Sequence, residues 1–178
     1  FVALKVEIQN WRWADVPFNL RTGKRLPERR TQIAIQFKGV PHSIFGGPAD
    51  GDLIANRLVI DLQPDEDIEL LLMNKAPGIT QRGMRLQSLP LSLSLLKVYS
   101  GPNSRRRIAY ERLLLDVILG ASALFVRRDE VEEAWRWVDG IAEAWGEAAM
   151  APKPYAAGSW GPAGAFALIE RSGRVWLD

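Results

Sequence analysis

Alternation of apolar and polar residues dominates the first half of the chain. A period of two places successive side chains on opposite faces of a strand, so each alternating run predicts a β-strand with one apolar face. Five runs show the pattern: Leu4, Val6, Ile8; Ile33, Ile35, Phe37; Leu58, Ile60, Leu62; Ile68, Leu70, Leu72; and Leu91, Leu93, Leu95. We therefore expect a single, largely antiparallel sheet whose apolar side is covered by helices and whose other side meets solvent or another subunit.

The second half changes to a helical period. From Asp129 onward, apolar residues recur every three or four positions along one helix face, and Asp129 with Glu132 predicts a capping box at the start. Residues 105–119 predict another helix with Gly120 as its C′ stop, and a last short helix is expected near Pro162. The fold class is therefore α+β, a largely antiparallel β-sheet backed by helices.

Composition narrows the class of protein. The chain has 178 residues, of which 47% are hydrophobic and 25% charged, and no repeat or linker divides it, so residues 1–178 are expected to form a single domain. It has no cysteine and no apolar run of the roughly 20 residues that cross a bilayer. A net charge of +2 is too small for a nucleic-acid protein. We expect a cytoplasmic protein, with no nucleic-acid or membrane partner, that binds small anions.

A basic loop is the first candidate for chemistry. Its cations surround Gly23 and Pro27, which favour a turn that could aim two of them at one phosphate. The other interpretation is a solvated basic loop. The loop contains Arg21, Lys24, Arg25, Arg29 and Arg30, with Glu28 as the opposing charge.

Five further segments accompany the loop: residues 10–18, 56–66, 109–117, 125–137 and 158–162. Together with the loop they resemble the glucose-6-phosphate dehydrogenase family over nearly the whole chain. The resemblance is to the C-terminal part of such an enzyme. Because Phe1 already belongs to an alternating run, we expect the chain to begin inside a strand of a longer protein.

The resemblance implies an oxidoreductase of carbohydrate metabolism. Such enzymes oxidise glucose 6-phosphate to 6-phosphogluconolactone with NADP in the oxidative pentose phosphate pathway, and the matched segment contributes substrate binding. Residue by residue, Lys24 and Arg29 match the cations that contact the sugar phosphate, and Gln63 matches a hydrogen-bonding residue of the same pocket. The turn at Pro27 would let a mobile lysine and a bidentate arginine converge, whereas Arg25 and Arg30 are expected to face solvent. Taken alone, without the resemblance, Gln63 is better explained as a surface amide.

Other parts of the family's site are missing from these residues. No Gly-rich fingerprint follows a strand, so NADP is expected to bind mainly to an N-terminal domain outside this chain. In the family the base is a His-Asp pair that follows a His-Tyr-Leu-Gly-Lys motif, whereas this chain has only His42, next to Pro41. No catalytic, cofactor-binding or metal-binding residue is assigned, and the fragment alone is expected to be inactive.

The resemblance also bears on assembly. Family members pair through the sheet of this domain, which implies a homodimer or homotetramer. Some hold a second NADP with basic and hydroxyl residues where this chain has Asp61, Glu69 and Leu70, so no second NADP is expected here. An alternative is a non-catalytic sugar-phosphate-binding or assembly module derived from the enzyme. The sequence leaves open NADP or NAD preference, oligomer size and independent folding.

Overall fold

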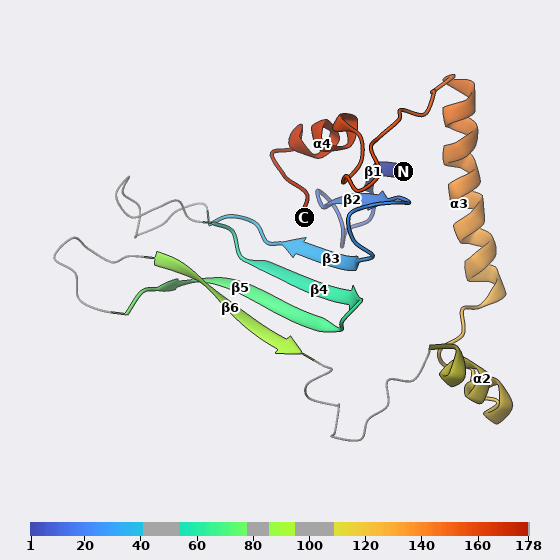
Figure 1. Ribbon diagram of the computed structural model, residues 1–178, viewed down its shortest axis with the longest axis horizontal. Helices are drawn as coiled ribbons and strands as arrows, with labels where there is room; N and C mark the ends of the chain where they lie inside the picture. Colours follow the sequence, from blue (N-terminus) through green and yellow to red (C-terminus); the bar gives the residue numbers. More distant parts are fainter. Residues whose placement is uncertain (41–53, 78–85, 95–108, 178) are drawn as a thin grey trace. The chain divides into compact units, whose positions relative to one another are not determined.

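The structure, a computed structural model, describes residues 1–40, 54–77, 86–94 and 109–177 (Figure 1). The chain divides into two compact units, Phe1–Gly101 with Tyr155–Asp178, and Pro102–Pro154. The α+β class is confirmed, while the single domain stays a prediction. The described strands are β1 (Val2–Glu7), β2 (Pro17–Thr22), β3 (Thr31–Gln36), β4 (Arg57–Gln63), β5 (Asp67–Lys75) and β6 (Leu86–Ser94). The described helices are α2 (Ala109–Leu119), α3 (Arg128–Glu147) and α4 (Ala163–Glu170).

The described strands form two antiparallel sheets, so the expectation of a single sheet was wrong. β1 pairs with β2, and a second sheet has the order β3-β4-β5-β6. Sequence reasoning missed β2, whose alternating apolar run consists only of Phe18 and Leu20. These two side chains lie opposite Val6 and Leu4, so the two strands share one apolar face.

Helix α4 completes the small core of this unit. It packs on β1 and buries Ala165 and Ile169. Its N-cap is Pro162, as predicted, where the fixed φ of proline suits the start of a helix. Trp176 donates its indole N–H to the carbonyl oxygen of Ala165 at 3.0 Å, which ties the end of the chain to this helix.

The four-stranded sheet has the predicted apolar face. One row across its strands is Ile33, Ile60, Ile68 and Leu93, and the next is Ile35, Leu58, Leu70 and Leu91. Among the described residues of this unit, no helix covers this face: α4 packs on β1, and several members of both rows remain exposed.

The second unit contains α2 and α3, and its helix ends only partly match the prediction. Gly120 has φ 68° after α2, which confirms the left-handed C′ stop. The capping box of α3 begins two residues earlier than predicted, where the carboxylate of Glu130 accepts the backbone N–H of Arg127 at 2.9 Å. Asp129 binds the Arg127 guanidinium instead, and Glu132 binds Arg128, so neither acid is available as a cap.

Candidate functional site

The basic loop connects β2 to β3. Lys24 and Arg29 are exposed there, and their side chains form no hydrogen bond or ion pair with the part of the chain that the structure describes. Two long cationic side chains on one short loop are thus free to move toward an anion. The loop therefore meets the first requirement of a phosphate site.

The turn of this loop differs from the sequence-based expectation. Gly23 does not have the positive φ that would require glycine; Arg25 does, at 54°. Gly23 is instead required by close packing, since a Cβ there would lie 2.8 Å from Cδ2 of Phe1. The left-handed residue aims its carbonyl oxygen at the C-terminal segment described below.

Gln63 lies beside the end of the loop. It is the last residue of β4 and is paired with Thr31, the first residue of β3, where the register shifts before Gln32. Thr31 comes two positions after Arg29, and the side chain of Gln63 is exposed. Strand pairing thus brings the side-chain amide of Gln63 and the basic loop to the same end of the β3–β4 pair.

Arg30 was wrongly expected to face solvent. Its Nε lies 3.4 Å from Oδ1 of Asp61 on the neighbouring strand, and the two side chains are only 27% and 28% exposed. Gln32 donates to the same oxygen at 2.9 Å. Because Arg30 already neutralises a carboxylate, it is unsuited to bind a further anion.

A C-terminal segment holds the loop from the other side. The hydroxyl of Tyr155 donates to the carbonyl oxygen of Lys24 at 2.5 Å, and the N–H of Gly158 donates to the carbonyl oxygen of Arg25 at 2.8 Å. Sequence reasoning did not single out Tyr155. The available signal was its position just before the segment 158–162, which carries part of the family resemblance.

Arg21 also joins β2 to this segment. Its guanidinium carbon lies 4.6 Å from the ring centre of Trp160 and 4.9 Å from that of Trp176, and Nη2 donates to the carbonyl oxygen of Leu177 at 2.6 Å. Stacking between two indoles fixes a guanidinium in place. Arg21 therefore has a structural role, which leaves Lys24, Arg25 and Arg29 as the exposed cations of the loop.

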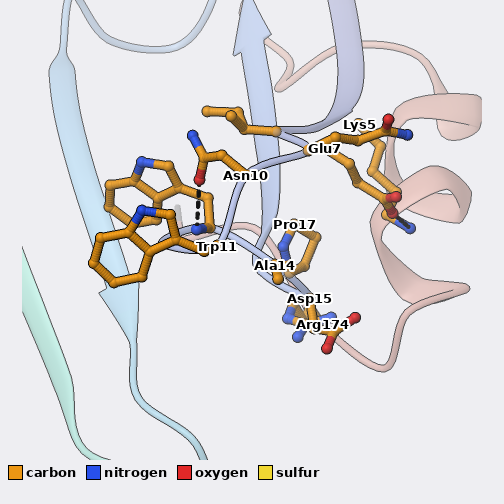
Figure 2. Close-up of a pocket in the computed structure, with 11 residues that line it drawn as sticks. Lys5, Glu7, Asn10, Trp11, Ala14, Asp15, Pro17 and Arg174 are labelled. Atoms are coloured by element: carbon orange, nitrogen blue, oxygen red, sulfur yellow. Dashed lines mark hydrogen bonds and ion pairs between the residues drawn. The ribbon is translucent and has the colours of Figure 1, made fainter.

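A cavity of about 660 Å³ lies elsewhere in this unit and includes none of the three predicted substrate residues (Figure 2). Its charges are balanced: Lys5 pairs with Glu7 at 2.8 Å, and the hydrogen bond and charge of Lys5 lower the pKa of Glu7. A balanced lining does not favour a dianion. The lining residues are Lys5, Glu7, Ile8, Gln9, Asn10, Trp11, Trp13, Ala14, Asp15, Pro17 and Arg174.

Metal and membrane sites find no support in the described ranges. No group of three or more histidine, cysteine, aspartate or glutamate side chains could hold a metal ion there. None of the helices placed by the structure has the length and apolar character to cross a bilayer. Residues 41–52 with His42, Leu95, and residues 105–107 of the predicted helix 105–119 lie outside the described residues.

Comparisons with known proteins identify the same family that the segments 10–18, 56–66, 109–117, 125–137 and 158–162 resemble. The family model described as "Glucose-6-phosphate dehydrogenase, C-terminal domain" matches residues 1–177. Two relatives named glucose-6-phosphate 1-dehydrogenase, from Zymomonas mobilis and Rhizobium meliloti, are each 53% identical over 100% of this chain. The chain spans only 36% and 35% of their lengths.

Solved structures give the same result for the fold. A glucose-6-phosphate dehydrogenase in complex with its substrate glucose 6-phosphate is similar with a TM-score of 0.80 and 32% identity, over 99% of this chain and 34% of that one. A glucose-6-phosphate 1-dehydrogenase from Mycobacterium avium gives a TM-score of 0.72 and 33% identity, over the same shares of the two chains.

Proposed function

We propose, because this chain belongs to the glucose-6-phosphate dehydrogenase family, that it is the part of such an enzyme that holds the phosphate of glucose 6-phosphate. The whole enzyme would transfer a hydride from C1 of the sugar to NADP and give 6-phosphogluconolactone in the cytoplasm. The proposal is supported by the basic loop, which lies beside Gln63. The side chains of Lys24 and Arg29 on this loop are exposed and form no hydrogen bond or ion pair with the described residues.

Each of the three residues has a distinct task in this proposal. Lys24 supplies a mobile point charge, and the planar guanidinium of Arg29 binds two phosphate oxygens at once. Gln63, at the end of β4, donates a hydrogen bond from its side-chain amide to the bound substrate. Charge-assisted hydrogen bonds of this kind hold the sugar at its phosphate end, which orients C1 for the reaction.

NADP supplies the hydride acceptor when it is bound, and the described residues do not fit its dinucleotide. They contain no Gly-rich turn between a strand and a helix. The chain's contribution to the reaction is therefore to bind and orient the substrate, and the residues that hold the cofactor and take the proton are assigned to the remaining two thirds of the relatives' length.

The alternative function is a non-catalytic sugar-phosphate-binding or assembly module. Sequencing the reading frame upstream of Phe1 and assaying its full-length product separate the two. A Gly-rich βαβ region followed by glucose-6-phosphate-dependent reduction of NADP supports the enzyme. A full-length product that binds glucose 6-phosphate but does not reduce NADP supports the module.

No second NADP is predicted to bind this chain. The carboxylate of Asp61 on β4 accepts hydrogen bonds from Arg30 and Gln32, and Glu69 lies on the same face of the adjacent strand β5. This face of the sheet therefore presents acids where the phosphates of NADP would need hydrogen-bond donors. Isothermal calorimetry of the chain with NADP should give only the heat of dilution. Saturable binding at micromolar NADP would contradict the prediction.

Self-association through the four-stranded sheet is also predicted. The apolar rows described above leave Ile33, Ile35, Leu91 and Leu93 exposed on one face of the sheet, and a contiguous exposed apolar patch is typical of an interface. We propose a second copy as the partner, which gives a homodimer or homotetramer. Sedimentation of residues 1–178 at micromolar concentration should show a dimer or a larger species.

Matched variants can test which face is involved. Leu91→Lys places a charge in the apolar row, whereas Ser92→Lys places it on the opposite face of the same strand. Leu91→Lys should shift the protein to monomer and Ser92→Lys should not. A monomer before any substitution, or equal effects of the two, would show that this face does not pair.

A further inference from the structure

The C-terminal segment 155–161 contacts the loop through two consecutive carbonyl groups. The Tyr155 hydroxyl donates to the carbonyl oxygen of Lys24 at 2.5 Å across a separation of 131 residues, and the N–H of Gly158 donates to the carbonyl oxygen of Arg25 at 2.8 Å. Hydrogen bonds to successive carbonyls fix the peptide planes between them. The direction in which the Lys24 side chain leaves the backbone is thereby restricted.

The ring of Phe1 keeps Tyr155 at the loop. It contacts the Tyr155 ring edge-on, with centroids 5.5 Å apart and planes at 61°. The same ring lies against Gly23 of the loop and Gly161 of the C-terminal segment, where an added Cβ would clash with it. Aromatic packing of this kind holds the phenol in place, so its hydroxyl is already directed at Lys24.

The backbone of the loop needs such support. Arg25 adopts a left-handed conformation at φ 54°, which is unfavourable for a residue with a long side chain. No side-chain hydrogen bond or ion pair within the described chain holds Lys24 or Arg25 there. The contacts from Tyr155 and Gly158 therefore supply the restraint that the loop's own side chains do not.

We propose that Tyr155 is a positioning residue for substrate binding: its hydroxyl holds the Lys24 carbonyl, so that the Lys24 side chain leaves the backbone in a restricted direction, toward the phosphate. This inference rests on the proposed function. Restricting a binding group before the ligand arrives lowers the entropy lost on binding. Tyr155 itself makes no contact with substrate in this proposal, and its effect passes entirely through Lys24.

The test uses Tyr155→Phe in the full-length enzyme. This change keeps the ring and its contact with Phe1 and removes only the hydroxyl. The KM for glucose 6-phosphate should rise about three- to tenfold, as expected for the loss of one hydrogen bond, while the KM for NADP stays within about twofold. Ser159→Ala is the matched control, because its hydroxyl donates to Ala156 at 2.7 Å inside the same segment; it should leave both KM values unchanged.

A double variant separates positioning from general stability. In a Lys24→Ala background, Tyr155→Phe should raise the KM for glucose 6-phosphate no further, because the side chain that it positions is gone. An unchanged KM in Tyr155→Phe alone, or the same rise in both backgrounds, overturns the positioning role and leaves the phosphate contact intact. If Lys24→Ala has no effect on KM, both the positioning role and the proposed phosphate contact are wrong.

Discussion

Replacing Lys24 or Arg29 with alanine in the full-length enzyme is expected to raise the KM for glucose 6-phosphate by about one to two decades. The reason is that a hydrogen bond to a charged group contributes about 1.5 to 3 kcal/mol, and each 1.4 kcal/mol corresponds to roughly tenfold in binding. The KM for NADP should barely change. Steady-state kinetics with each substrate varied in turn measures both values, and some loss of kcat is consistent with poorer alignment of C1.

The control variants come from the same loop. Arg25→Ala removes an exposed cation whose backbone, not its side chain, is held by the C-terminal segment, so its effect on KM should be several-fold smaller. Arg30→Ala is a weaker control than the sequence suggested, because it also removes the ion pair with Asp61. Equal effects of Arg25→Ala, Lys24→Ala and Arg29→Ala would mean that the loop acts as a diffuse electrostatic patch.

The largest effect is expected when the chain is tested alone: residues 1–178 should show no dehydrogenase activity. The chain has one histidine, His42, and no dinucleotide fingerprint, and it spans about a third of its relatives. NADP reduction by the purified chain at saturating substrate should equal a blank. Circular dichroism in the same buffer would show that the sample is folded.

Turnover well above the blank would place a base within these residues. His42 would then be the first candidate, as the chain's only histidine. His42→Ala would be expected to abolish that residual turnover, and a substitution at neighbouring Ser43 would serve as its control. The assignment of proton abstraction to the rest of the enzyme would be wrong.

Much of the fold could be predicted because local patterns specify it. Strand β6 shows the period of two at Leu91 and Leu93, and Gly120 and Pro162 mark helix ends through their own backbone preferences. β2 was missed because only Phe18 and Leu20 alternate with polar residues, which is too short a run to predict a strand, and because Pro17 is unfavourable in strands; pairing with β1 stabilises it all the same. Two sheets in place of one depend on which strands pair, which no local pattern contains.

The candidate site divides in the same way. Lys24 and Arg29 are visible in the sequence because charge and turn residues lie within one short segment. The position of Gln63 opposite Thr31 depends on the β3–β4 register, and the contact of Tyr155 with Lys24 joins residues 131 positions apart. The ion pair of Arg30 with Asp61 was missed for the same reason, since it forms across strands. Such long-range contacts follow from the tertiary fold.

The most direct measurement of the central claim compares glucose 6-phosphate with glucose as substrates of the full-length enzyme and its Lys24→Ala variant. If Lys24 binds the phosphate, the variant should lower kcat/KM for glucose 6-phosphate by about 10- to 100-fold and leave kcat/KM for glucose nearly unchanged, because glucose lacks the group that Lys24 contacts. An equal fall with both substrates would show that Lys24 supports the structure of the site without binding the phosphate, and would contradict the proposal.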